Sequence, residues 1–87
     1  MADFYIVCHG INFLNGVSIQ LSHNYIRNGK DVSLEFLEER GLIALQGPEA
    51  AKVLQHLTSV ELSTMAFMTG ATGSIAGVDD CRITRCG

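Results

Sequence analysis

Cysteine and histidine are the residues of this sequence with the widest possible chemistry, and a metal site is the first possibility to consider. The candidate ligands are Cys81, Cys86, His9, His23 and His56. Structural zinc sites combine a close Cys pair with a second matching pair, and the sequence has no second pair. On a strand, Cys81 and Cys86 would also point to opposite faces. The pattern therefore predicts no metal site.

Nucleophilic and acid–base catalysis require other arrangements. A catalytic cysteine needs a base beside its thiolate. Cys8 and His9 are adjacent, but neighbouring side chains along a strand point apart, so we predict buried, inert thiols. Asp79 and Asp80 are adjacent acids in a predicted turn, where such residues usually shape the turn and are solvated.

The remaining candidates concern ligand binding. The glycines at 70, 73 and 77 lack the Lys-Ser/Thr of a phosphate-binding loop and the full spacing of a dinucleotide fingerprint. Met65, Phe67 and Met68 could line a ligand pocket, but an apolar cluster of this kind is more often core. The residues alone therefore assign no catalytic group.

The first third of the chain contains a strand followed by an ambiguous segment. Phe4–Cys8 is a short β-prone run. Asn15-Gly16 lies between two apolar runs and predicts a β-hairpin, because Asn-Gly tolerates positive φ at both turn centres. The alternative is a helix that places Leu14, Val17, Leu21 and Tyr25 on one side. Asn15 and Gly16 are poor helix formers, so the hairpin is the prediction.

The middle of the chain predicts an antiparallel strand pair and then a helix. Residues 28–31 read as a turn, residues 32–36 alternate apolar and polar side chains, and residues 42–45 are continuously apolar. Pro48 suits the first position of the helix, where its missing amide costs nothing. The helix is amphipathic, should end near Thr58, and directs Gln55 toward water. Its apolar positions are Ala50, Val53, Leu54 and Leu57.

Residues 77–80 predict a turn, and residues 81–86 predict a strand with alternating side chains. The order of elements predicts an α+β domain with a small, mostly antiparallel sheet and one or two helices. We expect residues 1–87 to form a single partial domain.

Composition narrows the functional class further. The chain has 87 residues, of which 47% are hydrophobic and 17% charged, with a net charge of -3. A nucleic-acid-binding chain would show a basic patch, and the longest apolar run, residues 42–45, is too short to span a bilayer. The apolar content favours surface that a larger protein covers. Three cysteines without a regular framework suit a reducing compartment.

Two passages resemble a known family. Leu42–Leu54 is similar to the "ALQGPxAAxVLQ" passage of the aminomethyltransferases of the glycine cleavage system, the T-proteins. Phe67-Met68-Thr69 and residues 77–87 resemble their "FMT…GVxxCRVTRCG" passage. The likeness covers residues 29–87, whereas residues 1–28 are divergent. Cys8 stands where the family has an asparagine that helps to hold folate.

The resemblance implies part of a folate-binding domain. The family transfers a one-carbon unit from an aminomethylated, lipoylated carrier protein to tetrahydrofolate, in mitochondria. Phe67 and Arg85 are the residues that we assign to cofactor binding. No catalytic residue is assigned, because the family's essential aspartate is expected upstream of Phe4 and its "YTGE" folate contact downstream of residue 87. The isolated chain is therefore expected to be inactive.

Two other classes remain open from the sequence. One is a non-catalytic protein-interaction module derived from the T-protein fold, which would bind a partner through its apolar surface. The other is a different folate-binding member of the superfamily, such as a dimethylglycine-type dehydrogenase. The "TRCG" passage favours the T-protein over this second class.

Overall fold

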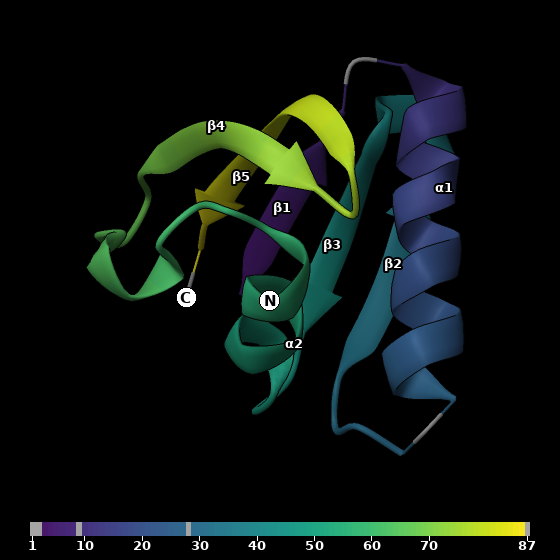
Figure 1. Ribbon diagram of the computed structural model, residues 1–87, viewed down its shortest axis with the longest axis horizontal. Coiled ribbons are helices and arrows are strands. Elements are labelled where there is room, and N and C mark those ends of the chain that lie inside the picture. Colours follow the sequence, from purple (N-terminus) through teal and green to yellow (C-terminus); the bar gives the residue numbers. More distant parts are fainter. Residues whose placement is uncertain (1–2, 9, 28, 87) are drawn as a thin grey trace.

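A five-stranded antiparallel sheet with the strand order β2-β3-β1-β5-β4 organises the chain (Figure 1). The computed structural model describes residues 3–8, 10–27 and 29–86. The central strand β1 pairs with β3 on one side and β5 on the other, and beyond β1 the amide of Cys86 donates to the carbonyl of Asp3 at 2.8 Å. The strands are β1 (Phe4–Val7), β2 (Ser33–Leu37), β3 (Leu42–Gln46), β4 (Gly70–Ile75) and β5 (Val78–Arg85).

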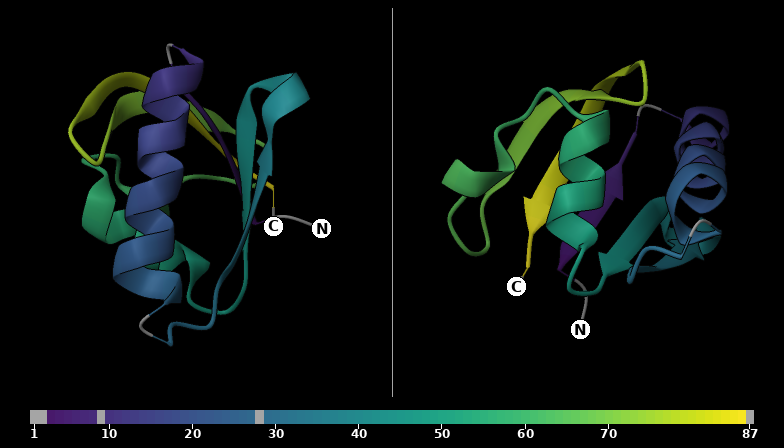
Figure 2. Two further views of the ribbon diagram at one scale, coloured as in Figure 1. Left: turned by 90° about the vertical axis from the view of Figure 1, so that its right-hand side faces the viewer. Right: turned by 60° about the horizontal axis from the view of Figure 1, so that its bottom comes forward.

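Two α-helices, α1 (Ile11–Leu21) and α2 (Ala50–Leu57), cover the same face of the sheet (Figure 2). The helix α1 continues into a π-helical turn at Ser22–Ile26, and short 3-10 turns occur at Glu38–Arg40 and Leu62–Thr64. One layer of helices on an antiparallel sheet is an α+β architecture. The predicted fold class is therefore confirmed.

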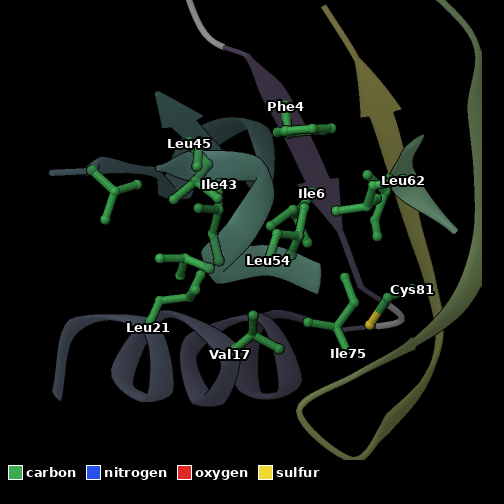
Figure 3. Close-up of a cluster of buried hydrophobic side chains, with 14 of the residues drawn as sticks. Phe4, Ile6, Val17, Leu21, Ile43, Leu45, Leu54, Leu62, Ile75 and Cys81 are labelled. Carbon is green, nitrogen blue, oxygen red and sulfur yellow. The ribbon is translucent and has the colours of Figure 1, made fainter. Parts of the chain in front are cut away.

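The hydrophobic core lies between the helices and the sheet (Figure 3). Alternation along β1 turns Phe4 and Ile6 inward, whereas Tyr5 and Val7 point away and are 37% and 42% exposed. The other buried side chains of the sheet and helices include Ile43, Leu45, Ile83, Leu14, Val17, Leu21, Val53 and Leu54. The core therefore lies on one face of the sheet, and Tyr5 and Val7 are exposed on the other face.

The hairpin predicted around Asn15-Gly16 is wrong, because these residues lie within α1. Leu14, Val17 and Leu21 form a helical stripe that is at most 1% exposed. Burying each such side chain contributes about 1.5–3 kcal/mol, whereas a glycine inside a helix costs about 1 kcal/mol relative to alanine. Packing against the sheet therefore outweighs the local turn preference.

The predicted strand pair is confirmed in β2 and β3, and α2 ends before Thr58 as predicted. The start of α2 differs from the prediction, because Ala50 is its first residue and Glu49 its N-cap. Pro48 instead lies in a turn in which the amide of Ala50 donates to the carbonyl of Gly47 at 3.1 Å. Proline fits the second position of such a turn because its φ is already fixed.

The hairpin of β4 and β5 differs from the prediction in the position of its turn. The turn lies at Ala76 and Gly77, and β5 begins at Val78, so Asp79 and Asp80 are exposed residues of a strand rather than of the predicted turn. The register shifts between Gly73 and Ile75, which marks a bulge in β4. The predicted strand at 81–86 is confirmed over residues 81–85, as part of the longer β5. The predicted turn at 28–31 falls partly outside the described residues, since Asn28 is not among them.

The substitution Gly16→Ala distinguishes the helix from the hairpin. In α1, Gly16 has no heavy atom within 4 Å of an added Cβ, so alanine should stabilise the chain by about 0.5–1 kcal/mol. In an Asn-Gly hairpin turn, which needs positive φ, the same change would destabilise it. Urea denaturation followed by circular dichroism measures the difference, and a lower midpoint for the variant would contradict the helix.

Candidate functional site

Arg85 holds the connector before β4 against the end of β5. Its Nη1 donates to the carbonyl of Met65 at 2.9 Å. Two backbone hydrogen bonds reinforce the contact: the amide of Met68 donates to the carbonyl of Arg85 at 2.8 Å, and the amide of Arg85 donates to the carbonyl of Thr69 at 2.9 Å. The segment 65–69 is therefore fixed beside Arg85.

Phe67 and Arg85, the residues predicted to bind the cofactor, are thus brought to the same end of β5. The Phe67 side chain is 64% exposed, whereas Arg85 is half-buried. Met68 is 65% exposed and has positive φ. Phe67 and Met68 therefore point outward, whereas Met65, whose carbonyl Arg85 binds, is buried. The role of Phe67 and Arg85 in binding folate stays a prediction.

A hollow of about 190 Å³ lies at this end of the sheet. Its charged groups are the carboxylate of Asp3 and the guanidinium of Arg85, and its other walls are mostly apolar. The lining residues are Asp3, Phe4, Gly47, Pro48, Ala51 and Arg85. Gly47 and Pro48 belong to the first family-like passage and Arg85 to the second, so the two passages meet at this hollow.

Gly47 shapes one wall of the hollow. Its φ is +133°, and an added Cβ would lie 2.7 Å from the carbonyl oxygen of Asp31, so no larger side chain fits without moving backbone. The amide of Gly47 donates to Oδ2 of Asp3 at 2.8 Å. This contact joins the turn before α2 to the residue that precedes β1. Glycine is therefore required here by both backbone conformation and space.

The volume of the hollow is below the roughly 300–1,000 Å³ that pockets for small molecules usually enclose. A second hollow, of about 310 Å³, lies at the other end of β5 and is lined by Phe13 and residues 77–80. Among the described residues, every buried polar side-chain atom already has a hydrogen-bond partner.

The cysteines match the prediction of buried thiols in two cases of three. Cys81 and Cys86 are buried, and burial raises the pKa of Cys86 above its usual value. Cys8 is half-buried and in contact with Cys81, and burial together with the hydrogen bond between the two thiols raises the pKa of Cys8 to about 12. Cys8 and Cys86 are therefore mostly protonated at neutral pH.

The histidines do not gather around these thiols within the described part of the chain. His23 and His56 are exposed, and the His56 ring contacts the edge of Tyr25 at a centroid distance of 6.2 Å. The predicted Cys8–His9 neighbour pair falls outside the described residues at His9. Over residues 3–8, 10–27 and 29–86, no three His, Cys, Asp or Glu side chains are close enough to hold a metal ion. In the same residues, no helix has the length and apolar content needed to cross a membrane.

Gln55 has a role that the sequence did not predict. We expected its side chain to face water, but its Nε2 donates to the carbonyl of Val60 at 2.8 Å and its Oε1 accepts from the amide of Leu62 at 2.9 Å. The side chain therefore fixes the connector that Arg85 also holds. The hydrophobic periodicity of a helix shows which side chains lie outside the core. It does not show which of them form hydrogen bonds with a neighbouring connector.

Residues 2–87 match the family model described as the GCVT N-terminal domain. The two family-like passages that meet at the Arg85 hollow lie within this match. The chain therefore belongs to the GCVT N-terminal domain family.

Named relatives agree with this assignment. The chain is 51% identical over 59 residues to the mitochondrial aminomethyltransferase of Homo sapiens, a match that covers 68% of this chain and 14% of the human protein. An aminomethyltransferase of Flavobacterium psychrophilum is 29% identical over 82 residues, covering 91% of this chain and 23% of that protein. The chain thus spans a small part of the relatives that it matches. No solved structure matches it significantly.

Replacing Arg85 with methionine tests its anchoring role. The variant Arg85→Met keeps much of the apolar stem but removes the donor to Met65, so the free energy of unfolding should fall by about 1–2 kcal/mol. Hydrogen exchange at the Met68 amide should also accelerate. Arg82→Met is the matched control, because Arg82 is an exposed residue of the same strand and its loss should change stability by no more than about 0.5 kcal/mol. Equal effects of the two substitutions would contradict the anchor.

Proposed function

We propose that this chain is part of an aminomethyltransferase that passes a one-carbon unit to tetrahydrofolate. The donor is the aminomethylated lipoyl group of a carrier protein of the glycine cleavage system. The observation that supports this most directly is the meeting of the two T-protein-like passages, with Gly47 and Arg85 lining one hollow. Residues 29–87 carry the proposal, and residues 1–28 are its divergent part.

The proposed location is the mitochondrion. The relatives from Homo sapiens, Mus musculus and Pisum sativum are all named mitochondrial aminomethyltransferases. Bacterial relatives carry the same enzyme name without a compartment. The lipoylated carrier protein is the proposed macromolecular partner, and neither nucleic acid nor membrane is part of the proposal.

We also propose that the isolated chain does not catalyse the reaction. In support, the hollow at Arg85 encloses only about 190 Å³, less than a typical small-molecule pocket, and we assign no group in it to catalysis. Arg85 and Phe67 would contribute contacts to a larger pocket, whose other walls come from further protein. Catalytic sites need their groups held to fractions of an ångström by supporting residues, and such support requires the complete pocket.

The exposed apolar side chains favour a second candidate function. Phe67 and Met68 are each nearly two-thirds exposed, and Tyr5 and Val7 lie on the open face of the sheet. Such surface suits contact with further protein. A non-catalytic module that binds a partner through this surface is therefore the alternative to a catalytic part.

Calorimetric titration of the isolated chain with tetrahydrofolate tests the incomplete pocket. We expect no heat that corresponds to micromolar or tighter binding, because the hollow cannot enclose the ligand. Bovine serum albumin at the same concentration serves as the control for nonspecific heats. A dissociation constant in the micromolar range would show that the chain holds a complete site.

A chimera tests whether these residues support catalysis in a complete enzyme. The matched 59-residue segment of the human relative is replaced with the corresponding residues of this chain. We expect tetrahydrofolate-dependent methylene-tetrahydrofolate formation within about tenfold of the parent, equivalent to about 1.4 kcal/mol in the activation barrier. A second chimera with Gly47→Ala should lose both stability and activity. A first chimera that folds with the parent's melting temperature and is inactive would favour the interaction module.

A further inference from the structure

Cys8 and Cys81 form a cross-strand pair of thiols. The β1–β5 register pairs Val7 with Arg82, so the next residues along each strand, Cys8 and Cys81, lie directly opposite each other. Both side chains fall on the helix-facing side, since Ile6 and Ile83 on that side are buried. Their sulfur atoms lie 2.7 Å apart, with the Cys81 thiol donating to Cys8.

This geometry meets the requirements of a disulfide. Opposed residues of an antiparallel pair have Cα atoms about 4.5 or 5.5 Å apart, and disulfides accept Cα separations of about 4.4–6.8 Å. Both types of cross-strand position therefore fall within the range. The two residues are 73 positions apart in the sequence, so the sheet alone brings them together.

We propose that Cys8 and Cys81 are the site of an intramolecular disulfide, formed by exchange with a low-molecular-weight disulfide such as oxidised glutathione. Each exchange releases one thiol of the small molecule. In total, two protein thiols and one small-molecule disulfide yield one protein disulfide and two small-molecule thiols. The protein sulfurs are oxidised and the small molecule is reduced, so no other oxidant is needed.

The order of the two exchanges follows from exposure. Cys81 is fully buried and Cys8 is half-buried, so the Cys8 thiolate attacks first and forms a mixed disulfide. The Cys81 thiolate then attacks the Cys8 sulfur and displaces the second small-molecule thiolate, which takes up the released proton. Cys81 is in place for this step because its sulfur already contacts Cys8.

The exchange depends steeply on pH. Burial raises the pKa of Cys8 to about 12, so across the range from neutral to moderately alkaline pH only a small fraction of the thiol is ionised. Below its pKa the thiolate fraction grows about tenfold for each pH unit. The bridge should therefore form slowly at pH 7 and about a hundredfold faster at pH 9.

The experiment treats the full chain with oxidised glutathione at pH 7, 8 and 9, blocks the remaining thiols, and maps the tryptic peptides by mass spectrometry. Trypsin cuts after Arg82 and Arg85, so Cys81 and Cys86 fall in different peptides. We expect the peptide of Cys8 to be joined to that of Cys81, with the mass of two hydrogens lost from the chain. The bridged chain should melt at least about 5 °C higher.

Two variants separate the bridge from other products. Cys86→Ser should still form the Cys8–Cys81 link, because Cys86 has no part in the pair. Cys8→Ser should form no internal bridge. Because Cys8 is half-buried, circular dichroism checks that this variant is folded. Glutathione retained on Cys8 of the folded wild-type chain, or a bridge that includes Cys86, would overturn the proposal. So would a rate that does not rise with pH.

Discussion

The pairing of β1 with strands on both sides is the constraint on which the rest of the structure depends. β2 with β3 and β4 with β5 are local hairpins, and an isolated two-stranded hairpin is marginal in water. The four residues of β1 join the two hairpins into one sheet by hydrogen bonds to β3 and β5. The same strand supplies Phe4 and Ile6 to the centre of the core. The joined sheet in turn offers α1 and α2 a face wide enough to bury their apolar stripes.

The candidate site also depends on this arrangement. Asp3 precedes β1, Gly47 follows β3 and Arg85 ends β5, so the three meet only when β1 lies between its two neighbours. Arg85 and Gln55 then hold the connector between α2 and β4 from two directions. The sheet therefore fixes both the residues that line the hollow and the connector beside it.

Local sequence patterns predicted the helices and strands in which the local conformational preference and the tertiary packing favour the same structure. The alternation at 32–36, the stripe of α2 and the alternation at 81–86 are of this kind. Residues 11–21 are the opposite case. Asn15-Gly16 favours a turn, and the helix is stabilised by packing against a sheet whose strands are distant in sequence. Pro48 suits both a turn and a first helical position, so its residue type could not decide between them. Arg85 was proposed as a site residue from the family resemblance. Its hydrogen bond to Met65 and the contact between Cys8 and Cys81 could be seen only once the strand register was known. No local pattern carries that information across 73 residues.

The hydrogen bond between Asp3 and Cys86 places the two ends of the described chain on adjacent strands. Neighbouring strands are about 4.8 Å apart, so a polypeptide that enters at Asp3 and leaves at Cys86 returns almost to its starting point. A segment with neighbouring ends can be inserted in a longer chain while the parts before and after it stay close together. The same closeness of ends makes the fold suited to circular permutation, with a short link joining Cys86 to Asp3 and new termini opened at the exposed turn around Gly77.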